Sequence, residues 1–161
     1  MSLLVMYFGL KGPHPDMKHH MILFGERYKE LIAEIFGKGG ELPEDFSLYL
    51  HAPSVTDDRL APDGCSAYYV LSPVPHLGHA DIDWDEVGPI YREKLLDYLE
   101  EHAIPNLRRD LDVVKTLTPF VFRDEMNAHL GSAFSVEPVL TQSAWFRPHN
   151  RDDVIPNMYI V

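Results

Sequence analysis

The chain has 161 residues, of which 45% are hydrophobic and 11% aromatic, a composition that disfavours disorder and a length that suits one domain. With 25 acidic against 14 basic residues, the formal net charge of −11 argues against a nucleic-acid partner, because such proteins carry a basic stripe. The longest apolar runs fall short of the ~20 residues of a membrane-spanning helix, and a single cysteine, Cys65, excludes an internal disulfide and indicates a reducing compartment.

The first part of the chain is predicted to contain two strands and one helix. The continuous apolar run Leu3–Leu10 favours a buried strand, and His20–Phe24 reads as a second, shorter one. Apolar residues then recur at helical spacing, which predicts a helix over Glu26–Phe36 that ends at Gly37. The stripe consists of Tyr28, Leu31, Ile32 and Ile35.

Two further strands and a second helix are predicted in the middle of the chain. Phe46–His51 and Ser66–Leu71 have strand composition, and the turn signal at 62–64 (Pro-Asp-Gly) suggests that they pair as antiparallel neighbours. Asp83 and Glu86 have the spacing of a capping box and predict the start of the second helix. That helix carries Tyr91, Leu95, Tyr98 and Leu99 on one face and ends at Ile104-Pro105.

The last third of the chain is predicted to be mostly irregular. Asp112–Leu117 reads as a strand, Pro119–Met126 as a short helix with Thr118 as its cap, and Met158–Val161 as a strand that is just starting. The interleaved elements predict a single domain over 1–161 of the α+β (mixed α/β) class, with a partly antiparallel sheet and two main helices.

His76 and His79, followed by Asp81, Asp83 and Asp85, have a spacing that could hold a divalent metal ion. The aspartates open like a calcium loop, but the loop pattern fails further on, where glycine and glutamate are required. The favoured interpretation is a solvated loop with carboxylates at a helix N-terminus.

The remaining candidates for chemistry give no site from the residues alone. His19 and His20 open a predicted strand, so their side chains should point to opposite faces and should not chelate together. Cys65 has no basic residue near it in sequence and reads as structural. With neither histidine group favoured as a ligand set, no metal site is expected. The sequence contains no GxGxxG, P-loop or GxSxG motif, and the catalytic residues stay unassigned.

The segment 131–152 (GSAFSVEPVLTQSAWFRPHNRD) resembles the bacterial-type phytoene desaturases, also called phytoene dehydrogenases. These are FAD-dependent oxidoreductases of carotenoid biosynthesis with the flavin amine-oxidase architecture. The resemblance covers the chain from Ser2 to Val161. Further segments that carry it are Met6–Leu10, Phe24–Tyr28, Asp45–Pro53, Leu60–Gly64, Tyr69–Gly78 and Thr118–Phe120.

The resemblance implies a substrate-domain fragment of a larger flavoprotein that introduces double bonds into a C40 carotenoid precursor. Full-length members begin with a strand and a GxGxxG turn that hold FAD, and a glycine-rich stretch follows the strand that matches Met158–Val161; neither is present here. We therefore expect FAD in the full-length parent, no bound FAD in this fragment, and no activity of the fragment alone. The expected alternative is a stand-alone module that binds an apolar ligand or a protein and has no catalytic activity.

The resemblance also implies a site and partners. We expect Gly131, Ser132, Glu137, Gln142 and Arg147 to lie nearest the flavin or the polyene. Alternatively, Glu137 and Arg147 form an ion pair that pins an irregular segment. The implied partners are a phytoene-like carotenoid and a membrane surface, with the chain cytoplasmic and the parent peripheral on the inner membrane. We expect the fragment to be a homodimer, because the run 3–10 and the unfinished last strand would leave unpaired strand edges.

Overall fold

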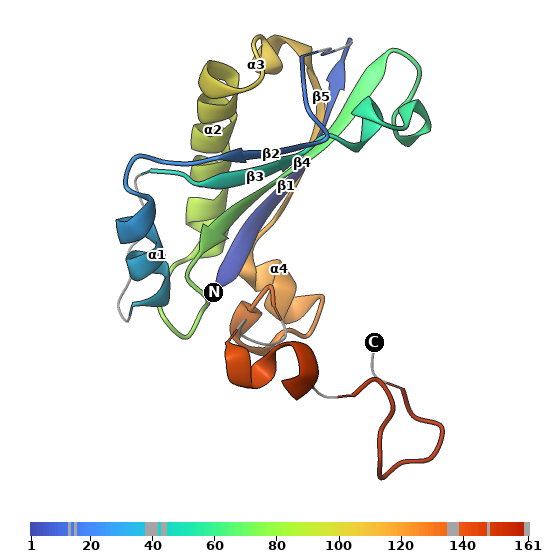
Figure 1. Cartoon of the computed structure of the whole chain (residues 1–161). Coiled ribbons are helices and arrows are strands. Elements are labelled where there is room, and N and C mark those ends of the chain that lie inside the picture. Colours follow the sequence, from blue (N-terminus) through green and yellow to red (C-terminus); the bar gives the residue numbers. More distant parts are fainter. Residues whose placement is uncertain are drawn as a thin grey trace.

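An antiparallel sheet of five strands, in the order β2-β3-β4-β1-β5, forms the centre of the computed structural model (Figure 1). The structure describes residues 1–12, 14, 16–37, 42, 45–134, 139–147 and 149–159. The strands are β1 (Ser2–Lys11), β2 (His20–Leu23), β3 (Leu48–His51), β4 (Cys65–Val74) and β5 (Leu111–Leu117). The helices are α1 (Tyr28–Phe36), α2 (Trp84–His102), α3 (Leu107–Asp110) and α4 (Pro119–Asp124). The predicted mixed fold with its antiparallel sheet is confirmed.

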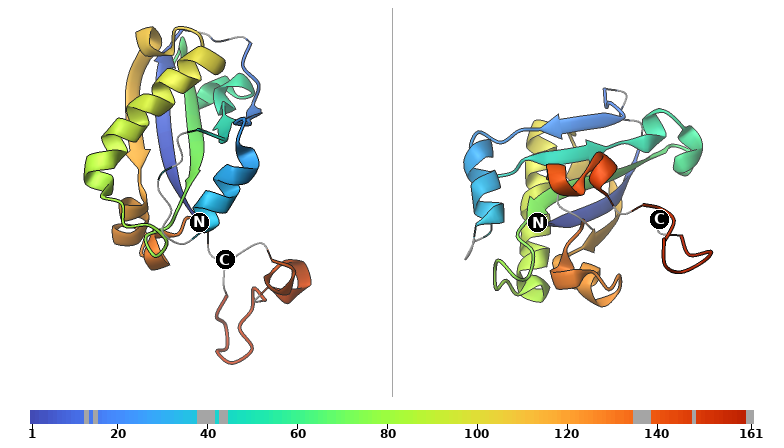
Figure 2. Two further views of the ribbon diagram at one scale, coloured as in Figure 1. Left: turned by 90° about the vertical axis from the view of Figure 1, so that its left-hand side faces the viewer. Right: turned by 60° about the horizontal axis from the view of Figure 1, so that its bottom comes forward.

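The main core lies between the sheet and α2, which runs along one face of the sheet (Figure 2). Alternate side chains of β1 point into this core, because successive residues of a strand face opposite sides. Those residues are Leu4, Met6, Phe8 and Leu10. They meet the apolar face of α2, made of Trp84, Tyr91, Leu95, Leu96 and Leu99.

Successive residues of β1 are apolar because the face of this strand that points away from α2 is also partly covered. Leu3 and Val5 pack with Leu117 of β5 in a second, smaller cluster, against side chains from α4. β1 is hydrogen-bonded to β4 on one side and to β5 on the other. The expectation that the run 3–10 leaves an unpaired strand edge is therefore wrong, and the homodimer expected from it stays a prediction.

The helix starts follow local capping chemistry. α2 begins after Asp83, whose carboxylate accepts hydrogen bonds from the backbone N–H groups of Asp85 (3.0 Å) and Glu86 (3.4 Å). This confirms Asp83 as the predicted cap. α1 begins at Tyr28, two residues later than predicted, and Thr118 precedes α4 without a side-chain capping bond.

The turn η3 (His129–Gly131) packs against α4. The chain beyond it leaves the sheet as a tail that contains the short 3₁₀ turns η4 (Leu140–Gln142) and η5 (Ala144–Phe146) (Figures 1 and 2). In place of the predicted last strand, Tyr159 forms an isolated antiparallel bridge with Arg151, and residues 160–161 lie outside the described part. None of the helices in the described ranges has the length and apolar character needed to cross a membrane.

Candidate functional site

The sheet face turned away from α2, which we call the open face, carries a row of rings that crosses the strands. Its side chains include Tyr7 on β1, His20 and Ile22 on β2, Tyr49 and His51 on β3, Tyr69 on β4, and Lys115 on β5. Directly opposite residues are His20 with His51, His51 with Tyr69, Tyr69 with Tyr7, and Tyr7 with Lys115. These side chains form a row because the strand register places all of these positions on the same face of the sheet.

Neighbouring rings in this row are in contact distance. The ring centroids of His51 and Tyr69 are 4.7 Å apart, and those of Tyr69 and Tyr7 are 5.6 Å apart. Part of the apolar surface stays exposed: Tyr7 is 46% and Ile22 is 61% accessible. The open face is thus an aromatic surface that the chain itself leaves partly uncovered.

A hollow of about 320 Å³ lies at the β1–β4–β5 part of this face. Its lining includes Tyr7, Gly9, Ala61, Pro62, Cys65, Ala67 and Val113. Gly9 keeps the hollow deep, because a Cβ there would lie 3.0 Å from the Val113 methyl carbon Cγ1. Lys115 and Asp112 are the charged lining residues, and Asp112 is engaged at 2.7 Å by the ammonium group of Lys11. The rest of this lining suits an apolar part of a bound ligand.

Gly131 and Ser132, two of the predicted site residues, lie at the covered end of the open face. Gly131 is buried with φ +63°, and a Cβ there would lie 2.3 Å from the carbonyl oxygen of Pro119. The hydroxyl of Ser2 donates a hydrogen bond to the Gly131 carbonyl. The Ser132 hydroxyl donates a hydrogen bond to the carbonyl oxygen of Phe134 at 2.8 Å. In this structure both residues hold the turn that closes one end of the face.

The other predicted site residues lie farther along the tail. Gln142 ends η4 and Arg147 follows η5, and both are exposed. Neither side chain makes a hydrogen bond or ion pair to another residue in the described ranges. Glu137 lies outside the described residues, and with it the alternative of a Glu137–Arg147 ion pair. The role predicted for these residues beside the flavin or the polyene stays a prediction.

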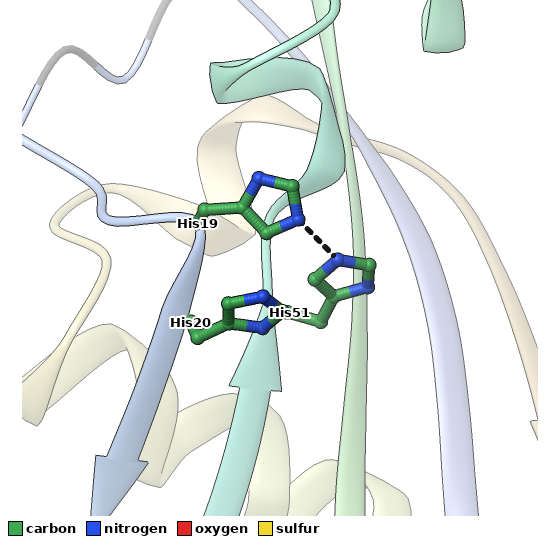
Figure 3. Close-up of side chains that lie close together, drawn as sticks. All are labelled: His19, His20 and His51. Atoms are coloured by element: carbon green, nitrogen blue, oxygen red, sulfur yellow. Dashed lines mark hydrogen bonds between the residues drawn. The ribbon is translucent and has the colours of Figure 1, made fainter.

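Three histidines come together at the edge of the open face, which the sequence reasoning missed (Figure 3). His19 lies just before β2 rather than in it, so its ring turns to the same side as that of His20, 4.3 Å away between centroids. His51 joins them through the β2–β3 pairing. The expectation that His19 and His20 point to opposite faces is therefore wrong. Burial, together with the neighbouring His19 and His20, lowers the pKa of His51.

The metal candidate at His76 and His79 is not assembled with its aspartates. The two rings lie 3.9 Å apart, but Asp83 is used as the cap of α2. Among the described residues, the trio of His19, His20 and His51 is the one group whose possible ligand atoms come close enough to hold an ion. The interpretation of 76–85 as a loop with carboxylates at a helix N-terminus agrees with this geometry.

The described residues do not fit the phosphate-binding part of an FAD site. A pyrophosphate needs a glycine-rich turn that leads into a helix N-terminus. α2 instead begins with Asp83, Asp85 and Glu86, which would repel an anion, and no other helix in the described ranges follows a glycine-rich turn. The acidic start of α2 therefore disfavours a pyrophosphate at that helix.

Comparison with known proteins gives similarity to phytoene desaturases over the whole of this chain. No family model matches the chain. It is 61% identical over 160 residues to the lycopene-forming phytoene desaturase of Pantoea ananas, and 62% identical over 161 residues to that of a Paracoccus species. It is 46% identical over 165 residues to the neurosporene-forming phytoene desaturase of Rhodobacter capsulatus. These matches cover 99–100% of this chain.

The chain spans about a third of the length of these relatives, 32%, 32% and 31% respectively. The resemblance to the phytoene desaturases that segment 131–152 indicated is confirmed, and it extends over the whole chain. The chain thus corresponds to one segment of such an enzyme.

Proposed function

We propose that this chain is the substrate-contacting part of an FAD-dependent phytoene desaturase, and that its open face lies against the polyene. The observation that carries the proposal is the continuous aromatic row from His51 through Tyr69 to Tyr7, together with the adjacent apolar hollow. Similarity over the whole chain to phytoene desaturases supports it.

The chemistry of the substrate explains why such a face is needed. Phytoene is a long hydrocarbon without a polar group, so a protein can hold it only by removing apolar surface from water, worth about 25 cal/mol per Å². Tyrosine rings offer broad apolar faces at little conformational cost, and a strand row arranges them along a line. An extended polyene matches a linear row better than it matches a round cavity.

The flavin, when bound, accepts the electrons removed as each double bond forms. Because the residues described here do not fit its pyrophosphate, we assign them to orienting the hydrocarbon. In this proposal phytoene reaches the open face from a membrane surface, where so apolar a molecule is dissolved.

We also propose that the product is lycopene. The lycopene-forming relatives are 59–62% identical to this chain, whereas the neurosporene-forming ones are 45–46% identical. The more similar relatives are therefore the better guide to the product.

The test is a desaturation assay on the protein that carries this chain, loaded with FAD and given phytoene in liposomes. We expect phytoene to be consumed and lycopene to accumulate, as measured by chromatography. Binding of phytoene without desaturation would contradict the enzyme assignment and favour an apolar-ligand module. Accumulation of neurosporene alone would refute the product assignment and leave the reaction class standing.

A further inference from the structure

The cluster of His19, His20 and His51 offers three imidazole groups at one point. Their possible ligand nitrogens all lie within 4.8 Å of one another (Figure 3). Two come from the start of β2 and one from the last residue of β3, so the strand pairing itself holds them together. Nothing in desaturation of a hydrocarbon requires a group of this kind.

The hydrogen bonds around the cluster orient two of the rings for metal binding. Nδ1 of His19 lies 2.5 Å from the Thr56 hydroxyl, and Nδ1 of His20 lies 2.6 Å from the Tyr49 hydroxyl. With the proton on each Nδ1 and donated to the hydroxyl oxygen, the lone pair is on Nε2. A ligating histidine is usually fixed in this way, by a hydrogen bond from its other ring nitrogen.

The third histidine shows why a cation suits the centre of the cluster. Nε2 of His51 lies 2.8 Å from Nε2 of His19. In the protonation state that binds a metal, both nitrogens have a lone pair, and the two lone pairs face each other. Without an ion, one of them must carry a proton to make this contact. A bound cation would replace that proton. Nδ1 of His51, buried and without a hydrogen-bond partner in the described part of the chain, would then carry the ring proton.

The contact between His19 and His51 needs little adjustment, whereas the widest nitrogen separation in the cluster, at most 4.8 Å, would have to shorten by up to about 1.5 Å. Zinc binds imidazole nitrogen at about 2.0–2.1 Å, which places tetrahedral ligand nitrogens roughly 3.3 Å apart. The His19 and His51 nitrogens would therefore separate by about 0.5 Å from their 2.8 Å contact, a change within reach of small ring rotations.

We propose that His19, His20 and His51 bind one divalent transition-metal ion of the zinc class through Nε2, with a fourth position open to water. Imidazole suits Zn²⁺, Cu²⁺ and Ni²⁺, and three histidines with one open position is a known zinc arrangement. The ion would clamp the start of β2 to the end of β3, at one end of the aromatic row. Thr56 and Tyr49 are positioning residues that orient the first two rings.

The test is calorimetric titration of ZnCl₂ into the full protein, purified without a histidine tag and treated with a chelator. We expect one ion per chain with a micromolar or lower dissociation constant. Replacing Zn²⁺ by Co²⁺ should give the strong visible absorption of four-coordinate cobalt. The exposed residue His20 allows a substitution, His20→Ala, that leaves the core intact, and His51→Ala tests the half-buried ligand.

Each ligand substitution should weaken zinc binding at least ~100-fold, and Tyr49→Phe should weaken it about 10-fold through the lost orienting bond. The matched control is the double variant His76→Ala/His79→Ala, which removes the other close histidine pair and should bind as the wild type does. The proposal is overturned if the wild type binds no zinc below millimolar concentration, if His20→Ala and His51→Ala both bind normally, or if the control loses the site. Circular dichroism confirms that each variant is folded.

Discussion

The hydroxyl of Ser2 donates a buried hydrogen bond to the carbonyl oxygen of Gly131, 2.5 Å away, and so joins the first strand to a residue 129 positions later. The bond lies where α4 and the turn after it cover Leu3 and Val5. The turn can approach β1 this closely because Gly131 has no side chain: φ is +63°, and a Cβ would meet the Pro119 carbonyl oxygen at 2.3 Å.

Gly131→Ala should therefore destabilise the protein through both backbone strain and a steric clash. We expect a loss of about 2–4 kcal/mol in the free energy of unfolding, measured by urea titration. Gly64→Ala is the matched control: Gly64 also has a positive φ, +73°, but a Cβ there has open space around it. That variant should lose only about 1 kcal/mol. Equal losses at the two positions would contradict the close packing of the turn on α4.

A second prediction concerns alkaline pH. Burial raises the pKa of Tyr91 to about 12, although a 2.8 Å hydrogen bond with the Ser72 hydroxyl opposes the shift. A raised pKa means that the folded state disfavours the phenolate. The contribution of the neutral Tyr91 phenol to the free energy of unfolding is fully present below pH 10, the ordinary tyrosine pKa. It is lost as the pH rises from 10 towards 12.

Tyr91→Phe should thus flatten the fall in unfolding free energy between pH 10 and 12, followed by urea titration at each pH. The contribution removed is of the order of 2 kcal/mol at the top of the window. Ser72→Ala is the control, because it removes the hydrogen bond but keeps the phenol, so the alkaline loss should persist. A Tyr91→Phe profile that parallels the wild type would show that this phenol does not resist ionisation.

The start of α2 gives a third prediction. Asp83→Ala removes the carboxylate that caps the helix and should lower the unfolding free energy by about 1 kcal/mol. Asp81→Ala, a nearby carboxylate with no capping bond, should change it by less than about 0.5 kcal/mol. Thermal denaturation of both variants compares the two losses, and a larger effect at Asp81 would contradict the capping assignment.

The elements that local patterns define were predictable, and the site was largely not. The apolar run of β1 and the Asp83 cap depend on neighbours in sequence, where strand composition and capping chemistry act directly. The aromatic row depends on register: His51 meets Tyr69, and Tyr69 meets Tyr7, only once strands far apart in the sequence are paired. No local signal carries that information.

The histidine cluster also depends on structure that the local sequence does not define. Two adjacent residues inside a strand do face opposite sides, but β2 begins at His20, so His19 lies outside that alternation. The strand start at His20 was predicted correctly, and the wrong conclusion came from extending the strand alternation to the residue before it. His51, the third member, again enters through strand pairing.

The central claim is that the open face contacts the polyene, and substitution of Tyr7 tests it most directly. Tyr7 is 46% exposed on that face, so Tyr7→Asp should place a charge against the hydrocarbon without disturbing the core. Ile90→Asp is the matched control, because Ile90 is 56% exposed on α2, behind the sheet.

The measurement is the rate of phytoene desaturation by the FAD-loaded protein in liposomes for Tyr7→Asp, Tyr7→Phe and Ile90→Asp. We predict a loss of at least ~10-fold for Tyr7→Asp, since one desolvated charge costs more than 1.4 kcal/mol. Tyr7→Phe, which keeps the ring, and Ile90→Asp should stay within about twofold of the wild type, because neither adds polarity to the open face. Wild-type rates for Tyr7→Asp, with all three variants folded, would contradict contact between this face and the substrate.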